Sequence, residues 1–334
     1  MPRTKNDLLR VFNSPELVEL RSKIVAGDPS GTPCDNCENK VKHSDLLPVE
    51  VLPNDENARM EIINSFHDGR AILNYLPPAL KFQTSKICNI NCIMCNQKPL
   101  QKKDYEYIDV KAISALFENI PFREIANVLM WGGEPLFAKD ALHILNMLSD
   151  RSDTDHTRIS IITNGTMIEN NLPLFNKLKK WHVAISLDAV GDLHGHIRRG
   201  ASFEKLDRGI RELVKLSDGM TRILTFNAII MKSTLRHTEE LIGYVSSLGV
   251  SPDSINFMLI RGGSEENFLY NKKGLSNIKV QEWKTPIQAC IQRLRIIECN
   301  SAANSLSFVY KQIRKFQETA NFHFKNEDTV ENIK

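Results

Sequence analysis

The sequence predicts an α/β fold in which six strand-and-helix units form a partial barrel. From about residue 80, short apolar segments alternate with longer segments whose apolar residues recur at helical spacing. This alternation is typical of a parallel sheet with helices on its outside. A chain of 334 residues is long enough for one barrel with flanking segments, or for two domains.

Six segments are predicted to be strands because they alternate apolar and polar residues or are largely apolar. They are residues 80–84, 126–131, 158–163, 183–187, 223–231 and 254–260. Five segments between them are predicted to be helices, namely 110–119, 139–149, 168–180, 203–216 and 238–248. A complete barrel has eight units, so we expect a partial (β/α)6 TIM-like barrel with functional groups at the carboxyl ends of its strands.

The segments that flank this barrel, which we assign to residues 80–264, have different patterns. Residues 1–50 are predicted to be a small cysteine-containing segment with a helix over 14–25, and residues 51–79 a connector with several prolines. Residues 265–334 contain no predicted strand. They are expected to form a C-terminal helical extension, with helices over 280–297 and 305–319 and a frayed polar tail at 326–328.

The charge and hydropathy of the chain exclude several classes of partner. Lysine and arginine number 43 against 40 acidic residues, a net charge of +3, and no long basic cluster is present. We therefore expect no nucleic-acid partner. No apolar run reaches the ~18 residues of a membrane span, and the N-terminus lacks the hydrophobic core of a signal peptide. We expect no membrane partner and a cytoplasmic location.

Seven cysteines fall into three groups, a pattern that indicates metal or redox chemistry in a reducing compartment. Cys88, Cys92 and Cys95 follow the first predicted strand with the spacing C-x3-C-x2-C. Iron–sulfur cubanes are normally held by four cysteine thiolates. Three would leave one iron open, as a catalytic metal requires. The alternatives are structural cysteines or a zinc site, although zinc sites prefer two C-x2-C pairs or added histidines.

The cysteine motif, at the end of the first strand of a barrel, resembles the signature of the radical S-adenosylmethionine (radical SAM) superfamily. Gly132, Gly133, Glu134 and Pro135 follow the second strand and resemble the family's GGEP motif, which binds the methionine amino group of the cofactor. Two glycines allow the backbone to approach a ligand closely, and Glu134 can accept a hydrogen bond from an ammonium group.

Three later strand ends extend the resemblance. Asn164 lies in a segment that resembles the family's TNG motif. Ser186 and Arg198 resemble residues of the SPASM/twitch-like subgroup, which includes anaerobic sulfatase maturases and peptide-modifying enzymes. There the serine contacts the ribose and the arginine the carboxylate of the cofactor. Asp188 is expected to hold a substrate or to orient Arg198. The strand that ends at Met231 would provide apolar contacts and backbone hydrogen bonds to adenine.

The resemblance covers about residues 80–262 and implies a [4Fe–4S] cluster with S-adenosyl-L-methionine at its open iron. An external one-electron reductant of the flavodoxin or ferredoxin type would reduce the cluster. The cofactor would then yield a 5′-deoxyadenosyl radical that abstracts hydrogen from a substrate. The subgroup favours peptide or protein modification. Radical chemistry on a small molecule, such as a sugar or nucleotide, is the alternative, and a non-catalytic iron–sulfur or electron-transfer protein is a third interpretation.

Residues 12–40 resemble the closing segment of the SPASM domain, which holds auxiliary iron–sulfur clusters. Here the segment precedes the barrel instead of following it. Three interpretations stay open. Cys34 and Cys37 bind an auxiliary iron–sulfur cluster or zinc with ligands from elsewhere, they are a remnant without metal, or the chain is one part of a larger or rearranged protein. Cys290 and Cys299 are expected to pack in the core.

Overall fold

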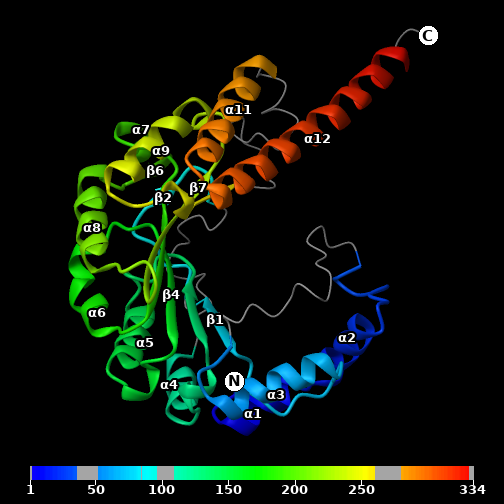
Figure 1. Ribbon diagram of the computed structural model, residues 1–334, viewed down its shortest axis with the longest axis vertical. Coiled ribbons are helices and arrows are strands. Elements are labelled where there is room, and N and C mark those ends of the chain that lie inside the picture. Colours follow the sequence, from blue (N-terminus) through cyan, green and yellow to red (C-terminus); the bar gives the residue numbers. More distant parts are fainter. Residues whose placement is uncertain (1, 36–51, 84, 96–108, 260–279, 331–334) are drawn as a thin grey trace.

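The computed structural model describes residues 2–35, 52–83, 85–95, 109–259 and 280–330. Its centre is a six-stranded, wholly parallel sheet in the order β1-β3-β4-β5-β7-β8 (Figure 1). The strands are β1 Ala79–Gln83, β3 Asn127–Trp131, β4 Arg158–Thr163, β5 Trp181–Ser186, β7 Arg222–Ile229 and β8 Ile255–Met258. All six predicted strands are present. Since β1 and β8 stand at opposite edges of the sheet, the predicted α/β fold with an incomplete barrel is confirmed.

Helices cover the outer face of this sheet, on the left in Figure 1. They are α4 Val110–Glu118, α5 Lys139–Ser149, α6 Leu172–Lys177, α8 Phe203–Leu216 and α9 Thr238–Ser247. The helix predicted over 168–180 is divided, because a 3-10 turn at Glu169–Asn171 precedes α6. Pro173 near the start of α6 suits the beginning of a new helix rather than the middle of one.

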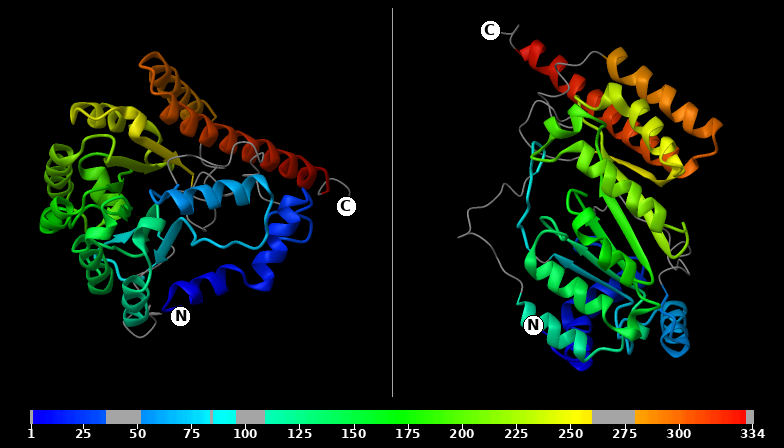
Figure 2. Two further views of the ribbon diagram at one scale, coloured as in Figure 1. Left: turned by 60° about the horizontal axis from the view of Figure 1, so that its bottom comes forward. Right: turned by 90° about the vertical axis from the view of Figure 1, so that its left-hand side faces the viewer.

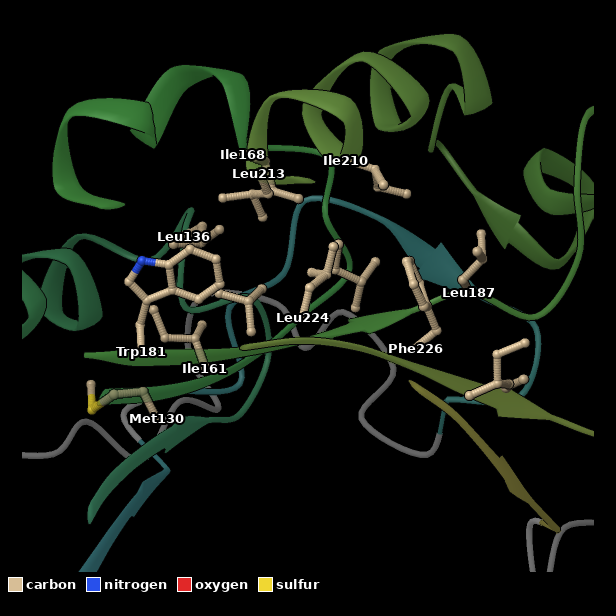
Figure 3. Packing of buried hydrophobic residues seen from close by; sticks show 14 of the residues in the cluster. Met130, Leu136, Ile161, Ile168, Trp181, Leu187, Ile210, Leu213, Leu224 and Phe226 are labelled. Atoms are coloured by element: carbon tan, nitrogen blue, oxygen red, sulfur yellow. The ribbon is translucent and has the colours of Figure 1, made fainter. Parts of the chain in front are cut away.

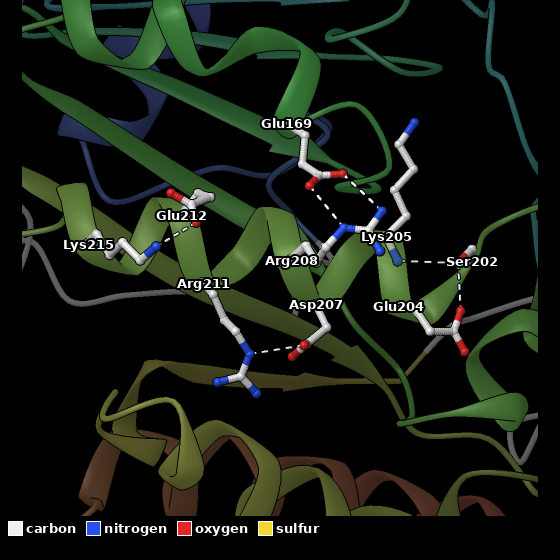
Figure 4. A network of polar contacts seen from close by, with 9 residues as sticks. All are labelled: Glu169, Ser202, Glu204, Lys205, Asp207, Arg208, Arg211, Glu212 and Lys215. Carbon is white, nitrogen blue, oxygen red and sulfur yellow. Dashed lines mark hydrogen bonds and ion pairs between the residues drawn. The ribbon is translucent and has the colours of Figure 1, made fainter.

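The core lies between the sheet and these helices. Met130, Ile161 and Trp181 of the sheet and Ile210 and Leu213 of α8 belong to one cluster of buried apolar side chains (Figure 3). The opposite face of α8 carries alternating charges instead. Figure 4 shows its ion pairs, among them Lys215 with Glu212 and Arg208 with Glu169. The helix is therefore amphipathic and fixed on the outer face of the sheet.

The two faces of the sheet differ in burial because alternate side chains of a strand point to opposite faces. Outer-face residues such as Ile159, Ile161 and Phe226 are at most 1% exposed. The opposite face, called the inner face from here on, carries partly exposed and often polar residues at the intervening positions, including Asn127, His182, Thr225, Asn227 and Asn256. Parallel sheets are usually covered on both faces. An accessible polar face is therefore a departure from the common arrangement.

The residues before the barrel form three helices, α1 Lys5–Phe12, α2 Pro15–Val25 and α3 Glu56–His67. The helix α3 lies within residues 51–79, which we assigned to a connector and for which we predicted no helix. The Asp55 carboxylate caps α3 by accepting from the backbone N–H of Ala58, and Ala58, Ile62 and Ser65 form its buried face. The prolines around the helix dominate the sequence pattern and conceal its short apolar period.

The C-terminal helices α11 Val280–Ile296 and α12 Asn300–Val330 lie side by side (Figure 2). The expected frayed tail at 326–328 is wrong, because α12 continues to Val330. Residues 300–330 contain no proline or glycine that would end the helix. Cys290 and Cys299 are buried in the core, as predicted. None of the helices in the described residues has the length and apolar character to cross a membrane.

Candidate active site

The loop after β1 carries the three clustered cysteines across the carboxyl ends of the strands. Its two-residue strand β2 Asn91–Cys92 pairs with β6 Arg198–Arg199, which brings Cys92 opposite Arg198. The backbone N–H of Ile93 also donates to the carbonyl of Ile197 at 2.9 Å. This ladder holds the loop so that all three cysteines line one cavity of about 330 Å³.

Most of the predicted site residues meet at this cavity. Its lining includes Cys88, Cys92, Cys95, Gly132, Gly133, Asn164, Ser186 and Arg198. The lining also contains residues outside our predicted set, namely Ile90, Asn91, Met94, Trp131, Ile162, Thr163 and Ile229. These residues neighbour predicted ones or end a strand, so strand ends were the signal that identified this edge of the sheet.

Met231 and Pro135 are predicted site residues that do not line the cavity. The strand β7 ends at Ile229, and the backbone N–H of Met231 donates to the hydroxyl of Thr234 at 2.8 Å within the following turn. This turn buries Met231 against Met94 and its neighbours in a small apolar cluster. Ile229 lines the cavity in its place. Pro135 is buried outside the cavity lining.

Gly132 and Gly133 allow two loops to touch. A Cβ atom on Gly132 would lie 2.5 Å from the carbonyl oxygen of Ser85, and one on Gly133 would lie 2.1 Å from that of Ile87. Both positions are too close for any side chain. The backbone N–H of Gly133 donates to Ser85 O at 2.8 Å and that of Glu134 to Ile87 O at 2.8 Å. The glycines therefore let the end of β3 pack directly on the cysteine loop.

Glu134 has partners other than the ammonium group that we expected. Its side chain is buried, with the residue 1% exposed, and it does not line the cavity. Its carboxylate accepts from the hydroxyl of Thr163 at 2.6 Å and from the backbone N–H groups of Asn164 at 2.6 Å and Leu136 at 3.0 Å. Burial raises the pKa of Glu134, and these hydrogen bonds oppose the rise. In this structure Glu134 holds the ends of β3 and β4 together.

Asn164 connects the end of β4 to the cysteine loop. Its side-chain N–H group donates to the sulfur of Cys88 at 3.7 Å and to Asn89 Oδ1 at 3.0 Å. The Oδ1 atom of Asn164 accepts from the backbone and hydroxyl of Thr166 at 3.0 and 2.7 Å. All four hydrogen bonds fix the amide, so that one N–H faces a thiol.

Arg198 and Asp188 form a buried ion pair beside Cys92. The Arg198 Nε atom lies 2.9 Å from Asp188 Oδ2, and its Nη1 donates to the sulfur of Cys92 at 3.7 Å. Burial lowers the pKa of Arg198, but the charges of Asp188 and Cys92 outweigh this effect and the pKa rises. Of the two roles expected for Asp188, the geometry shows the orientation of Arg198.

The surroundings of Cys88 and Cys92 favour the binding of a positively charged ligand. Burial raises the pKa of Cys88, and it raises that of Cys92 to about 11 although the nearby Arg198 opposes the shift. Charge on the other cysteines raises both further, so the thiolate forms need a cation among them. Thiolates are the ligands of iron–sulfur clusters, so the donor set fits one. Among the described residues, no three side chains that could bind a metal ion lie close enough together to share one.

The match to a known family covers most of the sheet that carries this cavity, but not its last strand, β8. The sequence model of the radical SAM superfamily matches residues 82–245, which extend from β1 to α9. Residues 82–245 belong to the radical SAM superfamily. Membership of the radical SAM superfamily implies a [4Fe–4S] cluster, binding of S-adenosyl-L-methionine and the use of an external reductant.

Several known proteins are similar to this chain. A probable GTP 3′,8-cyclase of Methanocaldococcus jannaschii is 23% identical over 203 residues, which are 60% of this chain and 65% of that protein. A 7-carboxy-7-deazaguanine synthase of Clostridium acetobutylicum is 34% identical over 90 residues, which are 27% of this chain and 39% of that protein. The crystal structure of Streptococcus suis SuiB bound to S-adenosylmethionine has a TM-score of 0.49 and 17% identity, with 73% of this chain and 53% of that chain covered. The chain spans about three fifths of the length of the GTP cyclases that it matches.

Proposed function

We propose that this chain is a radical SAM enzyme and that it acts on a small molecule of the sugar or nucleotide class. The observation that carries the proposal is the cavity in which Cys88, Cys92 and Cys95 face the glycines, Ser186 and Arg198. The substrate class is supported by the curated relatives, whose names include a GTP cyclase and a deazaguanine synthase. These relatives favour the small-molecule alternative over the peptide or protein modification that we expected first.

In this proposal the residues of the cavity have separate roles. Cys88, Cys92 and Cys95 bind the cluster, which when bound supplies the electron that cleaves S-adenosylmethionine to a hydrogen-abstracting radical. Gly132 and Gly133 bring the backbone close to the cofactor. Asn164, Ser186 and Arg198 line the same space, and Ser186 and Arg198 provide hydrogen-bond donors to it. The apolar residues Trp131, Ile162 and Ile229 on its wall exclude water from the reactive species.

The experiment measures 5′-deoxyadenosine under anaerobic conditions. The protein is reconstituted with iron and sulfide, reduced with dithionite, and incubated with S-adenosylmethionine. We expect product from the wild type and none from Cys92→Ala. The matched control is Cys299→Ala, which removes a thiol from the core instead of the cavity and should retain the product. A wild-type protein with a full cluster and no 5′-deoxyadenosine would contradict the proposed chemistry.

The substrate class has its own test. GTP with a deuterated ribose is added to the same reaction, and deuterium is sought in the 5′-deoxyadenosine. Transfer of deuterium would identify the nucleotide as the source of the hydrogen atom. Deuterium transfer from a deuterated peptide library, with none from nucleotides or sugars, would instead support peptide or protein modification.

The auxiliary metal site is a separate proposal. Cys34 is half-buried, and its backbone N–H donates to the hydroxyl of Thr32 at 3.2 Å, whereas Cys37 lies outside the described residues. We propose that the two cysteines bind a second cluster or zinc. Iron and zinc content of the Cys34→Ala variant tests this. A lower metal content than that of the wild type, with the main cluster still bound, supports the site. An unchanged metal content contradicts it.

A further inference from the structure

Basic side chains gather on the inner face of the sheet at the amino-terminal ends of its strands. Lys81 of β1, Arg158 of β4 and His182 of β5 occupy inner-face positions, and Lys180 directly precedes β5. The backbone N–H of Ile159 donates to the carbonyl of Lys180 at 3.0 Å, which brings Arg158 and Lys180 to the same level of the sheet. Arg158, Lys180 and His182 are called the basic cluster. Lys81 is not part of it, because its Nζ lies 4.6 Å from the centre of the ring of Trp131, at the carboxyl end of β3.

No acidic side chain accompanies the basic cluster within the sheet. The six strands contain neither aspartate nor glutamate. In the part of the chain that the structure describes, Lys180 Nζ contacts only a carbonyl, that of His156 at 3.5 Å. Within the same described residues, the Nε atom of Arg158 is buried and has no hydrogen-bond partner.

The charge of Arg158 disfavours a positive charge on Lys180 and on His182. Burial lowers the pKa of Lys180, and the charge of Arg158 lowers it further; the same two causes lower the pKa of His182. A buried donor without a partner also costs free energy. The pKa of a fully solvated lysine without a neighbouring cation is not lowered in this way. An anion at this end of the inner face would accept a hydrogen bond from the guanidinium and would offset the repulsion between the positive charges.

Neutral polar side chains connect the basic cluster to the cavity. Along β4 the inner face runs from Arg158 through Ser160 to Ile162, which lines the cavity. Four residues of a parallel strand cover about 13 Å. On the neighbouring strands His182 shares a hydrogen bond of 2.8 Å with Thr225, and Asn227 lies beside Ser186 of the cavity. A ligand can thus have its charged part at one end of this path and a hydroxyl- or amide-bearing part at the other.

We propose that the basic cluster binds the phosphate groups of a phosphorylated substrate, whose remaining part extends along the inner face to the cavity. Arg158 and Lys180 are the main ligands, because the arginine fork matches phosphate oxygens and the lysine adds a second positive charge. His182 lies at its margin. The inference rests on the proposed function and narrows its substrate from sugars and nucleotides in general to their phosphate esters.

The test compares three probes on the anaerobically reconstituted full chain, by calorimetry at low salt. GTP, guanosine and inorganic triphosphate are titrated into the wild type, Arg158→Gln, Lys180→Gln and the double variant. The control is Lys215→Gln, which removes the same charge from the outer surface of α8 (Figure 4). Thermal melting and cluster absorbance verify that each variant is folded and loaded.

We expect the wild type to bind GTP and triphosphate and to bind guanosine at least tenfold more weakly. Each variant should lose about tenfold in affinity for GTP, the effect of one charge-assisted hydrogen bond, and Lys215→Gln should lose none. Equal GTP affinity in all variants, or tighter binding of guanosine than of GTP, would overturn the proposal. Absence of any GTP binding by a wild type that does form 5′-deoxyadenosine would also overturn it, while the proposed radical chemistry would stand. A wild type that forms no 5′-deoxyadenosine is the separate failure of the proposed function.

Discussion

Asp188 holds Arg198 by an ion pair of 2.9 Å, and Arg198 in turn donates to the sulfur of Cys92. The carboxylate is also fixed from the other side, because its Oδ1 accepts from the backbone N–H of Ile229 at 2.9 Å. The position of the guanidinium beside the cysteine loop is thus determined by residues at the ends of two neighbouring strands, β5 and β7.

Loss of Asp188 should destabilise the protein through the unpaired charge that remains. We expect Asp188→Leu to lower the free energy of unfolding by about 3–5 kcal/mol, measured by urea denaturation of the cluster-free protein. The double variant Asp188→Leu, Arg198→Leu should lose less than the sum of the two single variants. Strict additivity would show that the ion pair has no coupling energy.

Arg198 should also adjust the reduction potential of the bound cluster. A cation that donates to a ligand sulfur stabilises the reduced, more negative state. Arg198→Gln should therefore lower the midpoint potential, by about 59 mV if the equilibrium changes tenfold. The measurement is a dye-mediated titration followed by electron paramagnetic resonance without S-adenosylmethionine. The exposed neighbour Arg199→Gln is the charge-matched control, and an equal shift in that variant would disprove a specific role for the contact.

Gly133 should tolerate no side chain. A Cβ at this position would lie 2.1 Å from the backbone oxygen of Ile87, so Gly133→Ala must displace the cysteine loop. We expect a loss of about 2 kcal/mol or more in stability and reduced cluster loading, measured by denaturation and by iron content. Gly243→Ala in α9 is the control. Nothing lies within 4 Å of its added Cβ, and alanine is the better helix former by about 0.8–1 kcal/mol.

His194 should make the folded protein sensitive to acid. It is fully buried in α7 Asp192–Ile197, and burial, together with the charge of Arg198, lowers its pKa to about 4. The carbonyl of Ala189 opposes this only in part. Unfolded histidine titrates near 6.5, so the unfolded state binds more protons between pH 6.5 and 4. Stability should therefore fall as the pH falls through this range, by up to about 3 kcal/mol.

The measurement is urea denaturation of the cluster-free protein at several pH values between 7 and 4. His194→Leu should remove most of the slope attributed to this residue. The exposed His196→Gln, on the same helix, should leave the slope as it is in the wild type. Parallel profiles for the wild type and His194→Leu would mean that another group determines the acid sensitivity.

The sequence was sufficient to predict the succession of strands and helices along the chain and the edge of the sheet at which the cavity lies. Periodicity is a local property, and the carboxyl ends of parallel strands meet wherever the sheet is parallel. The direction of a side chain at the end of a strand is not local. Glu134 and Met231 belong to the correct segments, yet hydrogen bonds to Thr163 and Thr234 turn their backbones and side chains away from the cavity.

The basic cluster was beyond prediction for a related reason. Arg158 and Lys180 are 22 residues apart in the printed sequence, and only the register of β4 and β5 brings them together. The helix α3 was missed because its apolar period is short and its neighbours are prolines. Both cases need information that a scan along the chain does not contain.

The ladder between β2 and β6 has only two residue pairs, and this small size affects how the cysteine loop responds to loss of the cluster. So short a ladder has little stability of its own and will persist only while something else immobilises the cysteine loop. Exposure to oxygen, which destroys iron–sulfur clusters, would release the cysteine loop, while Arg198 would remain paired with Asp188. Slow exchange of the Ile93 amide proton with solvent would therefore indicate, without an activity assay, that the cluster is bound and the cysteine loop is in place.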